Sequence, residues 1–335
     1  MTEKIKWGVL GAAKIALEKV IPAMQNSPIH EVYGLASRDL DKAKISAQEL
    51  GIPKAYGSYE DLINDPEIDV IYNPLPNDLH VPYTLKCIEA GKHVLCEKPL
   101  AMNPEEIDGL IEARDKHKVK VGEAFMVASN PQWIKAREIV QSGQLGKIKA
   151  VHGFFSYYNV QKDNIRNIPE SGGGGIWDIG CYPVFTSRFV LGKDPGRVVS
   201  MLEFDPNFRT DRLGSVLLHY PDDIHMTFTV STQLVPYQRM LFYGEKKLLE
   251  VMIPFNAPPD QANEIRIHDG NFLNPQPEII RLPVSNQYTM QADAFTQAIL
   301  DDSEVPVTLE NARVNAEVLH AIFESDKLEK WIDVK

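Results

Sequence analysis

Residues 91–100 read Gly91-Lys92-His93-Val94-Leu95-Cys96-Glu97-Lys98-Pro99-Leu100. The apolar run Val94–Cys96, between a glycine turn and a proline, predicts a short buried strand. Pro99 has no N–H with which to continue a central strand, and it restricts Lys98 to extended geometry. Because open α/β sheets bind their ligands at the carboxyl ends of their strands, Lys98 is a candidate functional residue. The alternative is a solvated surface lysine, which is the commoner state of this residue type.

The overall composition is that of a globular protein with an acidic balance. The chain has 335 residues, of which 44% are hydrophobic and 24% charged, and its net charge is −11. This length predicts about two domains, and the acidic charge argues against nucleic acid as a partner. Three cysteines indicate a reducing compartment and give no metal-ligand spacing. Without a signal segment or a membrane-length apolar run, we expect a cytoplasmic protein with no membrane partner and no metal.

The first third of the chain alternates between strand and helix patterns. The expected strands cover 4–10, 31–36, 69–72, 94–96 and 119–122, and the expected helices cover 17–25, 39–50, 80–90 and 104–116. This alternation is typical of an α/β domain, with a doubly wound parallel sheet and helices on both of its faces.

The loop after the first strand resembles a dinucleotide-binding turn. Gly11, Ala13 and Ala16 stand where the fingerprint Gly-x-Gly-x-x-Gly/Ala has its small residues. Gly11 can make the tight turn and Ala16 permits helix–strand packing, whereas Ala13 adds a methyl group where backbone approaches pyrophosphate. A simple tight turn is the alternative. The residues of this loop that we expect to bind a cofactor are Gly11, Ala12, Ala13, Lys14 and Ile15.

The end of the second strand favours NADP over NAD. An acidic residue there would bind the 2′-hydroxyl of a ribose, whereas an arginine accommodates a 2′-phosphate. The chain has Ser37 and Arg38 at this place, and both can donate to a phosphate. Asp39 comes one position too late and is expected to cap the next helix. Lys42, in that helix, is a further cofactor-binding candidate, and a solvated Arg38 is the alternative interpretation.

A third candidate segment leaves the strand predicted at 69–72. Two prolines stiffen this loop, and Pro74 with Leu75 offers an apolar surface on which a ring could rest. His80 lies in the first turn of a helix, which favours a structural or supporting role over a catalytic one. The cofactor-binding candidates of this segment are Asn73, Pro74, Leu75, Asn77 and His80.

With these segments in place, the chain resembles the glucose–fructose oxidoreductase, inositol dehydrogenase and rhizopine catabolism family, called Gfo/Idh/MocA. The matching segments are 7–16, 76–80, 91–99, 123–126, 146–148, 172–183 and 286–288. The resemblance implies a Rossmann domain, 1–125, followed by an α/β domain, 126–335, with a large, mostly antiparallel open sheet. It also implies a nicotinamide cofactor and a sugar, polyol or diol substrate.

The resemblance also implies the catalytic residues. The family's lysine of Glu-Lys-Pro maps to Lys98, and its second catalytic segment, Asp-x-x-x-His or Asp-x-x-x-Tyr, maps to Asp178 and Tyr182. This places the chain in the tyrosine branch. Arg166 and Tyr288 map to positions near the cofactor, and the alternatives for them are a surface ion pair and a core aromatic residue. Glu97 and Lys98 are also candidates for binding the cofactor. Two departures stand out, because Ala13 replaces a glycine and Val127-Ala128 replaces a frequent Tyr-Arg.

The side chains suggest how proton transfer would work. A free tyrosine titrates near 10, which is too high for efficient acid–base catalysis at neutral pH. A nearby ammonium favours the phenolate and lowers that pKa. We therefore expect Tyr182 to exchange the proton with the substrate. Lys98 should lower the pKa of Tyr182 and bind the reacting oxygen, and Asp178 should orient a substrate hydroxyl or the tyrosine. The alternatives are a flexible loop tip at Gly172–Gly175 and a Tyr182 that only packs against Phe185.

The second domain should contain a wide sheet. Strands are expected at 150–158, 197–204, 215–220, 225–235, 239–243, 248–252 and 264–267, and helices at 183–191, 288–301 and 309–327. Helices on one face would leave an apolar face open, which predicts a homodimer or homotetramer through this sheet.

The function that we expect is an NADP(H)-dependent oxidoreductase that transfers a hydride between nicotinamide and a sugar or a vicinal diol. An aldose resembling D-xylose is the best single substrate. One alternative is an NADPH-dependent reductase of a keto-sugar or dicarbonyl. Another is a non-catalytic regulator that senses NADP(H), which would have been favoured by the loss of Lys98 or Tyr182.

Overall fold

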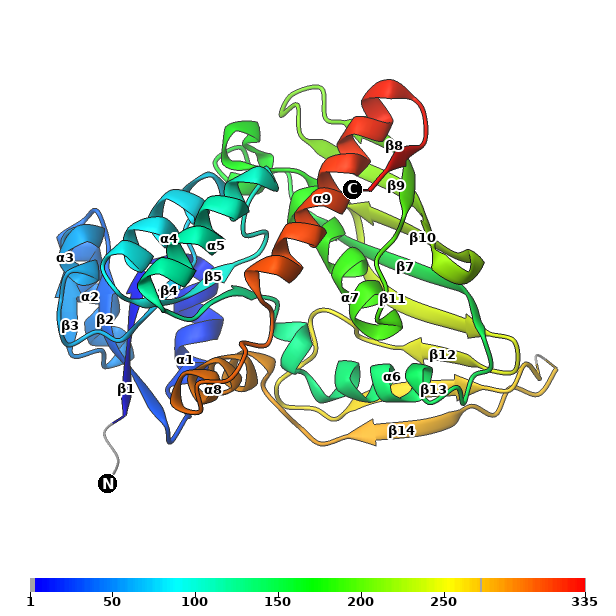
Figure 1. Cartoon of the computed structure of the whole chain (residues 1–335), viewed down its shortest axis with the longest axis horizontal. Helices are drawn as coiled ribbons and strands as arrows, with labels where there is room; N and C mark the ends of the chain where they lie inside the picture. Colours follow the sequence, from blue (N-terminus) through cyan, green and yellow to red (C-terminus); the bar gives the residue numbers. More distant parts are fainter. Residues whose placement is uncertain (1–3, 272, 335) are drawn as a thin grey trace. The chain divides into compact units, whose positions relative to one another are not determined.

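The computed structural model describes residues 4–271 and 273–334, which form two compact units (Figure 1). The first unit contains the chain up to Ser129 together with Asn286–Arg313, and the second contains Asn130–Ser285 and the chain from Val314. The division differs from the expected second domain, 126–335, chiefly at 286–313. Helix α8 (Gln287–Leu300) places Phe295 in the core cluster that contains Trp7, so this late segment completes the first unit.

The first unit contains a six-stranded parallel sheet in the order β3-β2-β1-β4-β5-β6. This is the strand order of a dinucleotide-binding sheet, and it confirms the doubly wound parallel sheet. The strands are β1 (Ile5–Leu10), β2 (His30–Ala36), β3 (Lys54–Tyr56), β4 (Val70–Asn73), β5 (His93–Glu97) and β6 (Val121–Ala124). Strand β3 was missing from the sequence analysis because only three residues form it.

Helices connect these strands. They are η1 (Ala16–Val20), α1 (Ile21–Met24), α2 (Leu40–Leu50), α3 (Tyr59–Ile63), η2 (Asn77–Leu79), α4 (His80–Glu89), α5 (Glu105–His117) and η3 (Met126–Ser129), besides α8. Asp39 caps α2 as predicted, because its carboxylate accepts hydrogen bonds from the backbone N–H groups of Asp41 and Lys42. The short helix α3, capped by Ser58, was not predicted.

The register of the sheet brings the predicted segments of the first unit to one edge. Tyr72 of β4 stands opposite Val9 of β1 and Leu95 of β5. Because the strands are parallel, their carboxyl ends meet at the same edge of the sheet. The Gly11 turn, the loop after Asn73 and Lys98 all follow directly on these ends.

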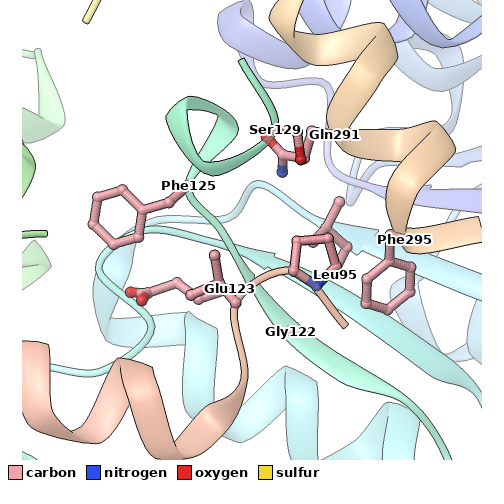
Figure 2. Close-up of a pocket in the computed structure, with 9 residues that line it drawn as sticks. Leu95, Gly122, Glu123, Phe125, Ser129, Gln291 and Phe295 are labelled. Atoms are coloured by element: carbon pink, nitrogen blue, oxygen red, sulfur yellow. The ribbon is translucent and has the colours of Figure 1, made fainter. Parts of the chain in front are cut away.

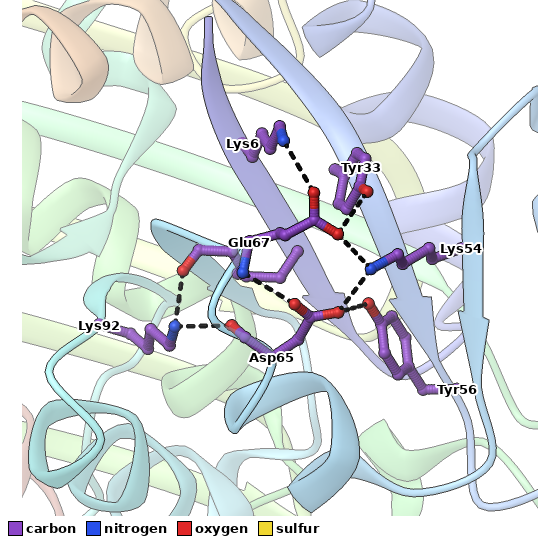
Figure 3. A network of polar contacts seen from close by, with 8 residues as sticks. Lys6, Tyr33, Lys54, Tyr56, Asp65, Glu67 and Lys92 are labelled. Carbon is purple, nitrogen blue, oxygen red and sulfur yellow. Dashed lines mark hydrogen bonds and ion pairs between the residues drawn. The ribbon is translucent and has the colours of Figure 1, made fainter.

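A polar network fastens the strands β2 and β3 to the loop before β4 (Figure 3). Lys54 donates to the carboxylates of Asp65 and Glu67, Tyr56 donates to Asp65, and Tyr33 donates to Glu67. The ammonium of Lys54 also lies 5.1 Å from the centre of the Tyr33 ring. Lys6 also donates to Glu67, so four side chains donate to two carboxylates.

The second unit contains a nine-stranded sheet in the order β14-β13-β12-β11-β7-β10-β9-β8-β15. Over the described residues only β7 and β10 pair in parallel, which confirms the large, mostly antiparallel sheet. The strands are β7 (Ile148–Tyr158), β8 (Arg197–Phe204), β9 (Asp211–Tyr220), β10 (Ile224–Ser231), β11 (Gln233–Gly244), β12 (Leu248–Val251), β13 (Asn263–His268), β14 (Glu278–Leu282) and β15 (Ile332–Asp333). The strand predicted at 225–235 is in fact two strands, because the chain leaves β10 at Thr232 and enters β11.

The helical segments of this unit are α6 (Pro131–Gln141), η4 (Ile165–Asn167), η5 (Pro169–Ser171), η6 (Ile176–Gly180), α7 (Cys181–Leu191) and η7 (Pro221–Asp223), together with α9 (Leu309–Leu328), which begins in the first unit. Helices α6 and α7 pack against each other and on one face of the sheet, α6 over β12 and β13 and α7 over β7 (Figure 1). Neither α6 nor β14 was predicted. Among the described residues, no helix combines the length and apolar character needed to cross a membrane.

The opposite face of the nine-stranded sheet is mixed rather than apolar. Apolar side chains such as Tyr237 and Met201 are exposed there. Between such residues lie polar contacts, including Glu250 with both Arg239 and His268. The prediction of an apolar face is therefore wrong in part. The alternating pattern of each strand shows which residues point outward, but it does not show that charged residues on neighbouring strands pair with each other.

The network around Asp65 and Glu67 predicts how stability depends on pH. Burial raises the pKa of Asp65, but hydrogen bonds from Tyr56, from the Glu67 N–H and from Lys54 outweigh it and bring the pKa to about 2. Hydrogen bonds from Lys54, Tyr33 and Lys6 likewise lower the pKa of Glu67 to about 2. Carboxylates with lowered pKa values stabilise the folded state above their unfolded pKa, near 4, and lose that contribution as the pH falls toward 2.

We expect Lys54→Met to flatten this dependence. The variant should lose less stability than the wild type between about pH 5 and pH 2, because part of the difference in proton uptake between folded and unfolded chain is gone. Urea unfolding across this pH range measures the effect. Lys162→Met, at an exposed position, is the control, and equal slopes for all three proteins would contradict the prediction.

Candidate functional site

Buried groups fix the turn around Lys98 from several sides. The hydroxyl of Tyr72 donates to Glu97 Oε1 over 2.6 Å, and the N–H of Lys98 donates to Glu97 Oε2 over 3.3 Å. On the other side, the Lys98–Pro99 peptide is cis, and the N–H of Leu100 donates to Glu123 Oε1 over 2.8 Å. Hydrogen bonds therefore fix the backbone on both sides of Lys98, from which its side chain extends.

His80 joins this turn to the loop that follows β4. Its Nδ1 lies 2.7 Å from the carbonyl oxygen of Pro99, and its Nε2 lies 2.7 Å from that of Leu75. Burial lowers the pKa of His80 to about 4, so at neutral pH the ring is uncharged and can donate to one of the two oxygens. Asn73, fully buried, donates to the carbonyl of His80 and to Thr84. The structure thus gives His80 and Asn73 contacts within the protein, and their contact with a cofactor stays a prediction.

The Gly11 turn is tight and leaves no room for a side chain. Gly11 has φ of +85°, and a Cβ there would lie 3.0 Å from Leu75 Cδ2 and 3.5 Å from the hydroxyl of Tyr59. Its N–H donates to the carbonyl of Ala36, which ties the turn to the end of β2. Helix begins directly afterwards and continues over 14–24. Ala12, Ala13 and Ile15 are partly exposed and Lys14 is exposed, so the loop can be reached by a ligand.

Ser37 and Arg38 stand at the end of β2, next to this turn. The hydroxyl of Ser37 accepts a hydrogen bond from the N–H of Asp39, while Arg38 is exposed. Tyr59 is buried, which raises its pKa, and Arg38 acts in the opposite direction through its charge and a side-chain hydrogen bond. Tyr59 therefore lies against both Gly11 and Arg38. Lys42 is exposed on α2, and the candidates of the first unit thus gather at one edge of the sheet.

Tyr288 approaches the same edge from α8. Its pKa is raised, first by burial and then by the negative charge of Glu97. The charge of Tyr288 in turn contributes to the raised pKa of Tyr72, after burial and Glu97. Tyr288 therefore lies near Glu97 and Tyr72 within the first unit, and the contact of Tyr288 and Glu97 with a cofactor stays a prediction.

A small pocket lies where α8 packs on β6 (Figure 2). It is lined by Leu95, Gly122, Glu123, Phe125, Ser129, Gln291, Phe295, Pro306 and Val307. A Cβ on Gly122 would lie 3.1 Å from both Phe295 Cε2 and the Val307 carbonyl oxygen. None of the predicted site residues lines this pocket, which marks the seam between the sheet and the returning segment rather than a substrate site.

In the second unit, Tyr182 is set among aromatic rings. Its ring lies 5.8 Å from Phe155 and 5.4 Å from Phe255, measured between centroids, and only 6% of the residue is exposed. Such a setting fixes the ring without requiring contact with Phe185, the partner in the alternative interpretation. Because aromatic walls exclude water, charges that face the phenol act on it strongly.

Asp178 and Arg166 form an ion pair in the same unit. Arg166 Nε lies 2.8 Å from Asp178 Oδ2, and the hydroxyl of Tyr157 donates to the same oxygen over 2.7 Å. The pKa of Arg166 is raised, first by the charge of Asp178 and also by the phenols of Tyr157 and Tyr182. Arg166, Asp178 and Tyr182 therefore interact within the second unit, whereas the contact of Arg166 with a cofactor stays a prediction.

The glycine run before Asp178 packs closely against its neighbours. A Cβ on Gly173 would lie 2.6 Å from the Arg166 carbonyl oxygen, and Gly174 has φ of +122°. A Cβ on Gly174 would also overlap the Oδ1 atom of Asp211. The run is thus a packed connection between η5 and η6, not a loose loop tip.

Four residues next to these groups were missed by the sequence analysis, namely Tyr59, Tyr72, Tyr157 and Asp211. Tyr72 and Tyr157 lie at or near the ends of predicted strands. In such an apolar pattern a tyrosine is interpreted as one more core residue. Asp211 lies far from the glycine run in the sequence, and no local pattern points to it. In the described part of the chain, no group of three His, Cys, Asp or Glu side chains is arranged to hold a metal ion.

Comparisons with known proteins agree with this arrangement. Residues 5–125 match the oxidoreductase family with an NAD-binding Rossmann fold, Gfo/Idh/MocA, and residues 133–250 match a Gfo/Idh/MocA C-terminal domain. An uncharacterized oxidoreductase of Rhizobium meliloti is 40% identical over 98% of both chains. D-xylose 1-dehydrogenase (NADP+) 2 of Haloferax volcanii is 33% identical, over 95% of this chain and 96% of its own.

A solved structure is similar over almost the whole chain. KijD10, a 3-ketoreductase from Actinomadura kijaniata in complex with NADP and TDP-benzene, has a TM-score of 0.90 at 26% identity, and the match covers 96% of this chain and 98% of that one. Sequence matches in both halves and this fold lead to one assignment: the chain belongs to the Gfo/Idh/MocA family of oxidoreductases.

Proposed function

We propose that the protein is an NADP(H)-dependent oxidoreductase that transfers a hydride between nicotinamide and a sugar, such as an aldose resembling D-xylose, or a vicinal diol. The observation that carries this proposal is the setting of Tyr182, a phenol packed between aromatic rings, whose charge contributes to the raised pKa of Arg166 after that of its ion-pair partner Asp178. The Haloferax volcanii relative, a D-xylose 1-dehydrogenase, supports the choice of substrate class.

In this proposal Lys98, Tyr182 and Asp178 are the catalytic residues. Oxidation of a carbinol requires a base for the hydroxyl proton, and reduction requires an acid. Tyr182 takes or gives that proton at its phenolic oxygen. The ammonium of Lys98 lowers the pKa of the phenol and binds the reacting oxygen. The Asp178 carboxylate orients the tyrosine or a substrate hydroxyl, and the cofactor, when bound, supplies or accepts the hydride.

We infer that the cofactor is NADP rather than NAD. The residues at the edge of the first sheet fit a dinucleotide, since the Gly11 turn carries no Cβ where Leu75 and Tyr59 approach. Ser37, Arg38 and Lys42 supply donors and positive charge for a 2′-phosphate. The name of the Haloferax volcanii relative and the NADP in the KijD10 complex agree with this choice.

The reverse reaction is the second candidate function. KijD10 is a 3-ketoreductase, and its fold matches this chain with a TM-score of 0.90. The same side chains would then protonate the oxygen of a keto-sugar or dicarbonyl while NADPH is oxidised. Turnover with NADP+ and with NADPH against one panel of sugars separates the two directions. A regulator that only senses NADP(H) would bind the cofactor without any turnover.

Tyr182→Phe tests the acid–base role. The variant should lose turnover by about 100-fold or more, the range expected for loss of general acid–base catalysis. NADPH binding, followed by fluorescence, should stay within about twofold, because the phenyl ring still packs on Phe155 and Phe255. Phe189→Leu, farther along the same helix, is the control variant. Turnover of Tyr182→Phe within about a factor of ten of the wild type would remove Tyr182 as the acid–base group.

Arg38→Ala tests the cofactor. Loss of a guanidinium that pairs with a 2′-phosphate should raise the dissociation constant of NADP+ by about 10-fold or more. The dissociation constant of NAD+, which has no 2′-phosphate, should stay nearly unchanged. Dissociation constants for both cofactors, on wild type and variant, give the result. Arg209→Ala, at an exposed position of the second unit, should change neither. Equal losses for NADP+ and NAD+ would contradict the assignment.

We also propose that the chain forms a homodimer or homotetramer in the cytoplasm, through the open face of the nine-stranded sheet. Exposed Met201, Val235 and Tyr237, next to paired charges, suit an interface with both apolar and polar contacts. Light scattering should give a mass at least twice that of the chain, 37.7 kDa. Tyr237→Glu should lower that mass. A stable wild-type monomer at micromolar concentration would exclude this assembly.

A further inference from the structure

We propose that Asp211 is a positioning residue for the proton-transferring tyrosine, because it anchors the backbone from which Asp178 and Tyr182 extend. This inference rests on the role proposed above for Tyr182. Asp211 is the first residue of β9, and it is distant in sequence from the glycine run that it contacts. All of these residues belong to the second unit.

The contact between Asp211 and the helical segment is direct and buried. Asp211 Oδ2 accepts a hydrogen bond from the N–H of Ile176 over 2.6 Å, and the carboxylate also interacts with the N–H groups of Gly175 and of Asp211 itself. Only 2% of Asp211 is exposed. Ile176 begins η6, which continues into α7 without a break, so a displacement at Ile176 is passed on to Asp178 and then to Tyr182.

The glycine run is shaped to receive this carboxylate. Gly174 has φ of +122° and leaves the space that Asp211 Oδ1 occupies. Gly175 has ordinary helical angles, φ of −69° and ψ of −38°, so its backbone does not require glycine. Yet a Cβ on Gly175 would lie 3.3 Å from Asp211 Oδ2, closer than most such contacts. The tight space at 175 therefore comes from Asp211 and not from the backbone angles of Gly175.

The carboxylate stays in this place at an energetic cost. Burial raises the pKa of Asp211 to about 7, although hydrogen bonds from Ile176, from its own N–H and from Gly175 act in the opposite direction. The negative charge of Asp178 adds to the increase, and the charge of Asp211 in turn contributes to the raised pKa of Tyr157. An apolar residue in its place would leave the buried N–H of Ile176 without its acceptor, which is costly. The Asp211 carboxylate thus holds the start of the helical segment that carries Asp178 and Tyr182.

Two substitutions approach the contact from its two sides. Asp211→Asn keeps the size of the side chain but can turn an amide N–H toward the N–H of Ile176. Gly175→Ala keeps the carboxylate and presses a methyl group against it. Asp205→Asn is the matched control, because Asp205 is a buried carboxylate whose hydrogen bonds come from the N–H groups of Asn207 and Phe208 and from the side chain of Gln233, and not from η6.

Three readouts test the proposal on the full chain: hydrogen exchange at amides 175–182, the kcat and KM of the proposed reaction, and the dissociation constant of NADPH. We expect Asp211→Asn to speed exchange and to lower kcat by about 10- to 100-fold, the cost of a small misplacement of a reacting group. NADPH binding should stay within about twofold. Gly175→Ala should change the same quantities in the same direction, less strongly, and the two effects should not add in the double variant.

Three outcomes would overturn the proposal. One is unchanged exchange and kcat in Asp211→Asn. The second is an equal change in Asp205→Asn, which would indicate a general loss of stability. The third is full additivity of the two variants. If Asp211→Asn does not fold, Gly175→Ala alone decides between faster and unchanged exchange. Exchange does not depend on turnover, so a failure of the proposed role of Tyr182, seen in Tyr182→Phe, is distinguishable from a failure of this anchor.

Discussion

The turn Glu97-Lys98-Pro99 depends on buried polar contacts that hold it from both sides. Tyr72 fixes the side chain of Glu97, and Glu123 holds the N–H of Leu100. His80 contacts the carbonyl of Pro99 and that of Leu75 with its two ring nitrogens. Because buried polar groups are costly unless they are paired, each of these partners constrains the others. The turn can therefore present a lysine in one place while the surrounding loops remain open to a ligand.

In the second unit, aromatic packing and a buried carboxylate hold the proposed catalytic tyrosine. Its phenol, Tyr182, lies between aromatic rings, and the charges near it are arranged by Asp178 through contacts with Arg166 and Tyr157. The helical segment that carries both residues starts at a buried carboxylate, Asp211. In both units a proposed catalytic residue is thus carried by backbone that forms hydrogen bonds with buried side chains. Preorganisation of this kind lowers the reorganisation that a reaction would otherwise require.

Much of the first unit could be predicted from the sequence, because its signals are local. Asp39 as a helix cap, Gly11 before a helix, and the apolar run before Lys98 each depend on a few neighbouring residues. The segment 286–313 could not be placed in this way, since Phe295 packs on Trp7 from the far end of the chain. The same limit applies to Asp211, whose partner Ile176 lies on another element, and to the paired charges of the open sheet face. Patterns within one segment do not contain such contacts.

The central proposal is that the ammonium of Lys98 lowers the pKa of the Tyr182 phenol. Its most direct test is the pH dependence of kcat for wild type and Lys98→Met, with saturating cofactor and substrate. The account predicts that kcat of the wild type depends on a group whose apparent pKa lies below about 10, the ordinary pKa of a tyrosine. In Lys98→Met this apparent pKa should rise by roughly one unit or more, because the nearby positive charge is gone. An apparent pKa that is the same in both proteins, or that is lower in Lys98→Met, would contradict it.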